Sequence, residues 1–265
     1  MSAQPAHLIV GSVNWYGAWT LYHKEVRRFL KVPAQTLIAP TATTLLMLAI
    51  FALALGGRMR VVGDVPYLEF LAPGLVMMSI ITNAFANTSS SLVMSKLQGN
   101  IVDLLMPPLT AAEIAGAFLL GGLTRGLVTG VVLALALQPF VTLVPQHPGF
   151  VLFHAVAAST ALAMIGTIGG IWAERFDHIS VVTHFVITPF AFLSGTFYSV
   201  ERLPGALHTL TRFDPFFYMI DGFRYGFIGE ADGSLAIGIA VMCVLNLALW
   251  LICHRLLESG YKLRP

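Results

Sequence analysis

Residues 70–93 read FLAPGLVMMSIITNAFANTSSSLV, a run of 24 residues that contains no Asp, Glu, Lys or Arg. As an α-helix this run would be about 36 Å long, which exceeds the roughly 30 Å hydrocarbon core of a bilayer. Lipid offers the backbone no hydrogen-bonding partner, so a helix, which pairs its own N–H and C=O groups, is the expected conformation. The run therefore predicts a membrane-spanning helix.

The rest of the chain repeats this pattern. Five further apolar stretches are long enough to span a bilayer, at approximately 36–55, 114–137, 150–172, 179–197 and 235–253. The chain lacks the alternating ten-residue segments of a membrane β-barrel. Pro40, Pro73 and Pro189 lie inside these spans, where we expect them to kink the helices. The sequence predicts an all-α integral membrane protein, a single domain (1–265) of six spans.

Composition supports a lipid-facing surface. The chain is 57% hydrophobic and 11% charged, whereas soluble domains average about 25% charged residues. So few charges cannot cover a surface that faces water. The formal net charge of +2 is small and scattered, which argues against nucleic acid as a partner.

Lysine and arginine are distributed unevenly between the two sides that six spans create. One side holds nine of them, Lys24, Arg27, Arg28, Lys31, Lys96, Arg175, Arg255, Lys262 and Arg264. The other holds five, Arg58, Arg60, Arg202, Arg212 and Arg224, while Arg125 falls inside a span. Because cytoplasmic loops are enriched in these residues, both termini are predicted to be cytoplasmic.

The segment before the first span, residues 12–32, is amphipathic. At 100° per residue its apolar side chains gather on one face: Trp15, Trp19, Tyr22, Val26, Phe29 and Leu30. Its cations gather opposite: Lys24, Arg27, Arg28 and Lys31. This pattern is typical of a helix lying in the membrane interface and binding lipid. The alternative is a helix packed on a soluble partner.

Residues 94–113 join the second and third spans on the predicted cytoplasmic side. Ile101, Leu104 and Leu105 recur at i, i+3 and i+4, and Pro107-Pro108 follow, which predicts a short amphipathic helix. Its apolar face suits a groove on a partner protein. It suits equally a loop that folds back on its own helices.

The segment 203–230 on the outer side is apolar but interrupted. Residues 216–228 are too few to span a bilayer, so we expect a re-entrant or interfacial helix. Asp214-Pro215 supplies an N-cap and a proline at the first helical position. Asp221 and Arg224 are expected to pair at i, i+3. A second short helix is expected around 207–212, which makes this segment a structured hairpin.

Few ionisable groups lie inside the spans. Arg125 is costly there and is expected either to bind an anionic substrate head group or to act as a structural pin between helices. Gly122, Gly126 and Gly130 recur every four residues, which indicates close helix packing or, alternatively, a glycine-lined conduit. His154 and His184 are expected to be hydrogen-bonded core histidines.

Motifs of catalysis are missing from the sequence. None of the four lysines is followed by Ser or Thr, so none belongs to a phosphate-binding loop. There is no HExxH and no GxSxG, and Ser194-Gly195 lacks the leading glycine of an intramembrane serine protease. We therefore predict no catalytic residue, metal site or cofactor on this chain.

Four stretches carry a resemblance to a known family. They are 70–78 (FLAPGLVMM), 100–108 (NIVDLLMPP), 192–199 (FLSGTFYS) with Leu203-Pro204, and 214–224 (DPFFYMIDGFR). With these, the sequence resembles the permease subunits of ABC-2 type exporters over nearly its whole length, and in particular their bacterial inner-membrane branch. The family often has asparagine where this chain has Asp214, and both residues cap helices.

The resemblance implies partners and roles. Two permeases work with two separate ATPase subunits, which bind the ATP and Mg²⁺, and the loop between spans two and three inserts into the ATPase. The residues implied in coupling are Leu97, Gln98, Asn100, Ile101, Asp103, Leu104, Leu105 and Pro107, with Leu104 and Leu105 as the expected anchors. Those implied in an outer gate are Phe213, Asp214, Pro215, Tyr218, Asp221 and Arg224. The implied function is export of an amphiphilic, glycoconjugate, lipid or drug-like cargo.

A stand-alone secondary transporter or channel is the alternative function. Such proteins place carboxylates inside their spans to couple transport to ions, and the six predicted spans contain none. This absence favours the exporter.

Overall fold

A computed structural model describes residues 13–55, 61–62 and 65–263 of the chain. The α-helices are α1 (Trp15–Leu30), α2 (Ala39–Leu55), α3 (Tyr67–Leu97), α4 (Ile101–Leu105), α5 (Ala111–Leu137), α6 (Pro148–Trp172), α7 (Phe176–Val182), α8 (Thr188–Leu193), α9 (Gly205–Arg212), α10 (Pro215–Ile228) and α11 (Leu235–Ser259). Two π-helical turns, η1 (Ala34–Ile38) and η2 (Thr183–Ile187), and a 3₁₀ turn, η3 (Val200–Arg202), interrupt or join them. Strands β1 (Val61–Val62) and β2 (Val65–Pro66) pair antiparallel.

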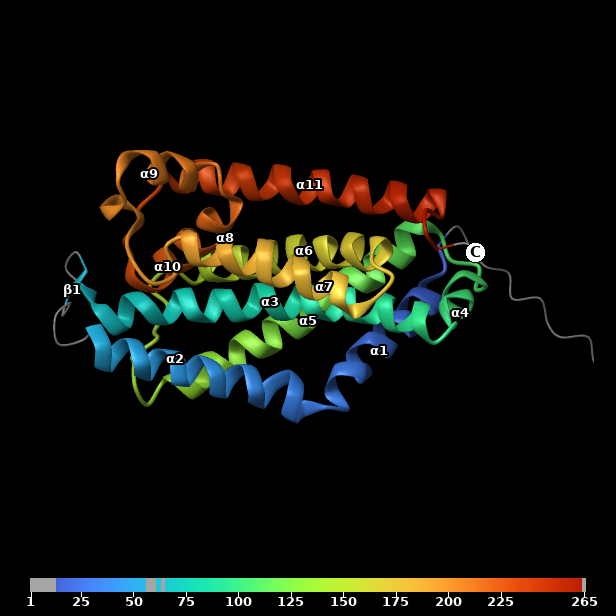
Figure 1. The fold of residues 1–265 in the computed structure, drawn as a ribbon, viewed down its shortest axis with the longest axis horizontal. Coiled ribbons are helices and arrows are strands. Elements are labelled where there is room, and N and C mark those ends of the chain that lie inside the picture. The colour runs from blue at the N-terminus through green and yellow to red at the C-terminus, as the bar shows by residue number, and fades with distance from the viewer. Residues whose placement is uncertain (1–12, 56–60, 63–64, 264–265) are drawn as a thin grey trace, which may run out of the picture.

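Six helical segments in the described residues are long and apolar enough to cross a membrane, at 34–54, 67–97, 111–137, 148–172, 176–193 and 235–259. The predicted all-α fold with six spans is confirmed. The bundle is elongated, with α4 and the end of α11 at one end and β1 and α9 at the other (Figure 1). The chain is thus a multi-pass membrane protein.

The bundle is built around α3. In the most apolar 18-residue stretch of α3, 78% of the residues are buried. In the corresponding stretches of the first span and of α11, only 11% are buried. α3 packs against α5, α6 and α10 (Figure 1). Outer helices that expose most of their side chains suit lipid or another protein, since lipid tails are as apolar as the core.

Two of the three span prolines follow π-helical turns. Pro40 comes just after η1, and Pro189 just after η2. Proline lacks an N–H and its ring clashes with the carbonyl four residues earlier, and a widened turn relieves both problems locally. The fifth span ends at Leu193 instead of the predicted 197, because Gly195 adopts a left-handed φ of +81° that no α-helix continues.

The glycines of the third span are packing positions. A Cβ at Gly122 would lie 2.6 Å from the Cβ of Ala163 on α6, and one at Gly126 would lie 3.1 Å from the carbonyl oxygen of Ile80 on α3. Gly166 on α6 likewise faces the side chain of Thr88 and the backbone of Phe85. These close approaches support the packing interpretation over the conduit.

Candidate functional site

The loop after α3 forms the short helix that the sequence predicts. Its apolar face folds back on the helices of the same chain. Leu104 is 5% exposed and packs in an apolar cluster with Leu21, Phe118 and Leu257 of this same chain. The side chain of Leu105 packs against the same cluster. The expected anchors therefore point toward the permease itself, because the apolar side of α4 packs in one cluster with residues of α1, α5 and α11.

The opposite side of this loop is also apolar, and it is open. Leu97, Val102 and Met106 are exposed, Met106 to 76%. Gln98, Asn100, Asp103 and Pro107 are exposed around them. The Asn100 side chain makes no capping bond to α4; its Nδ2 donates a long bond of 3.5 Å to Gln98 Oε1 on the same exposed side. A cytoplasmic binding surface on this loop would use these residues.

The loop is tied to α1 and α5. Thr110 and Glu113 form a capping box at the start of α5, and Glu113 Oε1 also accepts a bond of 2.5 Å from the backbone N–H of Asn14. Asn14 Nδ2 donates to the carbonyl of Pro108 at 3.3 Å. These bonds connect the loop directly to the start of α1.

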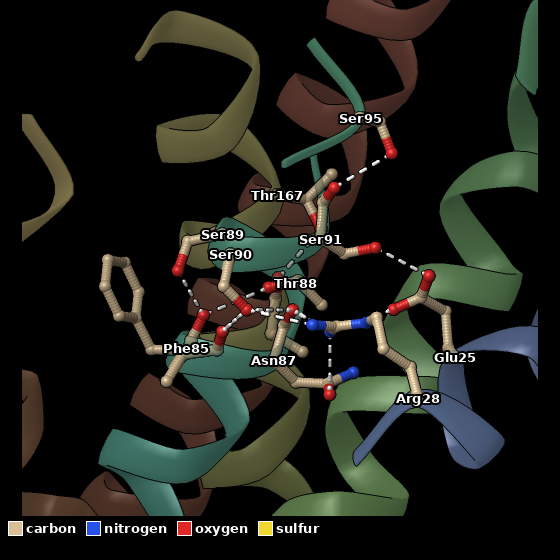
Figure 2. Close-up of polar contacts among 12 residues, drawn as sticks. Glu25, Arg28, Phe85, Asn87, Thr88, Ser89, Ser90, Ser91, Ser95 and Thr167 are labelled. Carbon is tan, nitrogen blue, oxygen red and sulfur yellow. Dashed lines mark hydrogen bonds and ion pairs between the residues drawn. The ribbon is translucent and has the colours of Figure 1, made fainter. Parts of the chain in front are cut away.

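A polar cluster holds α1 against α3. Glu25 is fully buried and accepts a hydrogen bond of 2.6 Å from Ser91 Oγ. Arg28 pairs with Glu25 at 3.2 Å and donates to the carbonyl and the side chain of Asn87 at 2.5 and 3.1 Å. Ser90 accepts a further bond from Arg28 at 3.1 Å. Figure 2 shows these side chains converging between the two helices.

This cluster corrects the predicted orientation of α1. The sequence placed Arg28 on the cationic face, opposite the apolar residues, but its guanidinium bonds Glu25 and Asn87 inside the bundle. Leu21, Glu25 and Phe29 form the buried face, while Trp15 and Trp19 are exposed, as an interfacial helix requires. Sequence analysis missed Glu25. Its signal was present, because Glu25 lies four residues from each of the buried apolar residues Leu21 and Phe29.

Arg125 contacts a neighbouring helix. Its Nη2 donates to Asn83 Oδ1 on α3 at 3.0 Å, which fits the pin interpretation, with a side-chain amide in place of the expected carbonyl. Of the two histidines, His154 is buried and bonds the carbonyl of Phe150 at 3.0 Å, as expected. His184 is exposed on η2, so its prediction as a core residue is wrong.

The outer hairpin consists of an exposed α9 and a buried α10. Asp214 caps α10 by accepting a bond of 2.9 Å from the N–H of Phe216, and Ser194 Oγ donates to it at 2.6 Å. Pro215 occupies the first helical position, as predicted. Tyr218 Oη donates to the carbonyl of Arg212 at 2.9 Å, and Phe213 between the helices is exposed. Burial raises the pKa of Asp214 to about 6.

The expected Asp221–Arg224 ion pair does not form: among the described residues neither side chain takes part in an ion pair. Arg224 donates to the carbonyls of Phe70 at 3.2 Å and Gly195 at 2.6 Å and stacks on the Phe70 ring. Asp221 accepts bonds from the N–H groups of Asp232 at 2.8 Å and Gly233 at 3.0 Å. Both residues are buried, and each bonds backbone groups of other segments.

Burial disfavours the charged forms of both residues and shifts their pKa values accordingly. It raises the pKa of Asp221 and lowers that of Arg224 to about 10. Through its hydrogen bonds to Phe70 and Gly195, Arg224 fixes α10 to α3 and to the turn after α8. No group of three or more His, Cys, Asp or Glu in the described part of the chain is placed to hold a metal ion.

Comparison with known proteins identifies the family to which this chain belongs. Residues 16–228 match the ABC-2 type transporter family. The chain belongs to the ABC-2 transporter family. It is 37% identical over 250 residues to the inner membrane transport permease YadH of Escherichia coli, an alignment that covers 94% of this chain and 98% of YadH. It is 25% identical over 259 residues to nodulation protein J of Rhizobium leguminosarum, covering 96% and 97% of the two chains.

The family assignment confirms the resemblance seen in the sequence. All four motif stretches lie inside the region that matches the ABC-2 family. In this ABC-2 permease they lie at both ends of the bundle, near the start of α3, in the loop with α4, at the end of α8 and in α10.

Proposed function

We propose that this chain is the membrane-spanning subunit of an exporter driven by ATP hydrolysis on a separate subunit. It has no catalytic residue of its own and moves an amphiphilic glycoconjugate, lipid or drug-like cargo. One observation carries the proposal: Leu97, Val102 and Met106 form an exposed apolar surface at the end of the most buried span. Membership of the ABC-2 family and the absence of a Gly-Lys-Ser/Thr motif from the sequence support it.

In this proposal the loop 94–113 is the coupling element and receives the motion of the ATPase. The buried side of α4 contacts the cluster formed by α1, α5 and α11, so a push on the exposed side moves these helices together. Packed helices transmit such displacements because their interiors are close-packed. At the far end α10 moves with α3, while the exposed α9 and Phe213 line the outer gate.

A second copy of the chain is part of the proposal. The first and fifth spans bury only 11% and 17% of their most apolar windows within one copy. Their open faces suit a symmetric contact between two permeases around a shared path, and lipid covers the remainder.

We also propose that the chain lies in the bacterial inner membrane with both termini in the cytoplasm. YadH is named an inner membrane permease, and the excess of Lys and Arg on one side predicts cytoplasmic termini. The start of α1 and the end of α11 lie at the end of the bundle that carries α4 (Figure 1). In this proposal the coupling loop therefore lies on the cytoplasmic side.

The test replaces one exposed apolar residue by a charge. Met106→Asp should lower co-purification with the partner ATPase subunit, and the cargo-stimulated turnover of that subunit, at least tenfold, because an unpaired charge in an apolar groove costs several kcal/mol. Val144→Asp is the matched control, since Val144 is likewise an exposed apolar loop residue but lies outside the coupling loop, and it should behave as wild type. Leu104→Asp is unsuitable, because Leu104 is buried in the permease.

Two results would contradict the proposal. One is unchanged assembly and turnover of the Met106→Asp variant. The other is cargo transport by the purified chain alone in liposomes without ATP, which would favour the secondary transporter or channel.

A further inference from the structure

A large basic cavity lies between α1, η1, α3 and α5. Its volume is about 960 Å³, within the range of small-molecule sites. The cationic side chains that line it are Lys24, Arg27, Arg28, Lys31 and Arg125. No Asp or Glu of the described chain joins them in the lining. The cavity is therefore strongly positive.

Most of this charge is not neutralised by the protein. Arg28 pairs with Glu25, which lies behind it. Among the described residues no carboxylate lies within 4.0 Å of the charged groups of Lys24, Arg27, Lys31 or Arg125. A charge at membrane depth is costly unless it is paired or hydrated, so an anion in the cavity would remove part of that cost.

Two of the arginines are held rigidly yet keep unused donors. Arg28 is fixed by Asn87 and Ser90, and Arg125 by Asn83. The Nε–H groups of both arginines are nevertheless buried without an acceptor in the described part of the chain. Guanidinium groups match the geometry of phosphate oxygens, and fixed donors lose little entropy on binding.

The same cavity has an apolar part. Phe29, Val32, Met94 and Phe176 line it together with the cations, and the exposed tryptophans of α1 place this helix at the membrane interface. If a free inorganic anion bound here, the apolar part of the lining would remain exposed to water. A molecule with a phosphate head group and a hydrocarbon tail satisfies both parts.

We propose that this cavity binds the phosphate head group of an anionic amphiphile from the adjacent leaflet. The rim cations Lys24, Arg27 and Lys31 attract the head group, and Arg125 with Arg28 receives its oxygens at depth. This proposal goes beyond the exporter function, since binding requires neither the ATPase nor transport.

The test measures binding to the purified full chain in a neutral detergent. The probes are dioctanoylphosphatidylglycerol, dioctanoylphosphatidylcholine, inorganic phosphate and pyrophosphate. We expect saturable binding of phosphatidylglycerol, weakened by salt, and at least tenfold weaker binding of the other three. Arg27→Gln/Lys31→Gln should weaken phosphatidylglycerol binding about 30-fold, because each cation near an anionic head group contributes about a factor of five.

The control is Arg212→Gln/Arg255→Gln, which removes the same charge from two exposed arginines outside the cavity. It should bind within twofold of wild type. Equal loss in both double variants would indicate general electrostatic attraction and overturn the site, as would unchanged binding in Arg27→Gln/Lys31→Gln. Equal binding of phosphatidylcholine would overturn the requirement for net negative charge. Equal binding of pyrophosphate would overturn the lipid source and assign the cavity to a free anion.

Discussion

Glu25→Ala should destabilise the protein by about 3 kcal/mol. The substitution removes the acceptor of the buried Ser91 hydroxyl at 2.6 Å, and a bond to a charged group contributes about 1.5–3 kcal/mol. It also removes the partner of Arg28 at 3.2 Å, which adds about 1 kcal/mol because the Arg28 side chain is 31% exposed. A small cavity next to Gly121 adds to the loss.

The assay is the unfolding free energy of the purified chain in mixed micelles, with Glu258→Ala as the control. Glu258 is an exposed carboxylate, so its loss should change stability by less than about 0.5 kcal/mol. In a double-mutant cycle, Glu25→Ala and Ser91→Ala should show a coupling energy of about 1–2 kcal/mol. If Glu25→Ala resembles Glu258→Ala, the buried cluster does not hold α1 on α3 and the reasoning is refuted.

Three further outcomes follow from the packing. The folded pKa of Asp214, about 6, exceeds its ordinary 3.8, so the folded state binds the proton more tightly. Stability should rise by about 2–3 kcal/mol as the pH falls from 7 to 4; Asp214→Asn should flatten this profile in a melting series, and an unchanged slope would contradict it. Gly122→Ala should cost about 1–3 kcal/mol by overpacking against Ala163, while Gly116→Ala, which meets no atom within 4 Å, should be neutral or stabilising; equal melting temperatures would refute the glycine argument. Arg224→Gln should lower the melting temperature by leaving the carbonyl of Gly195 without its buried donor, and wild-type melting would contradict that role.

The spans and caps could be predicted because their determinants are local. A run of 24 uncharged residues specifies a spanning helix wherever it is placed. Asp214 followed by proline specifies the start of α10 for the same reason. The glycines of α5 also identified a packing face, because residues four apart share one side of a helix.

The partners of the buried charges could not be predicted, because they are distant in the sequence. Spacing alone suggested that Arg224 pairs with Asp221 three residues away, whereas it bonds the carbonyl of Phe70, 154 residues away. The sequence pattern did not single out Glu25, whose partner Ser91 lies 66 residues away. Periodicity assigns a residue to a face of its helix, and only the tertiary packing decides what that face contacts.

The two misread arginines have a common consequence for motion. Arg28 binds the carbonyl of Asn87 in the second half of α3, and Arg224 binds the carbonyl of Phe70 near its start. These carbonyls are separated by 17 residues, or about 25 Å of continuous helix. Charge-assisted bonds to buried backbone are strong and directional, so α1 and α10 cannot slide freely along α3. We therefore expect a displacement of α1 at one end of the bundle to tilt α3 and to carry α10 with it at the other.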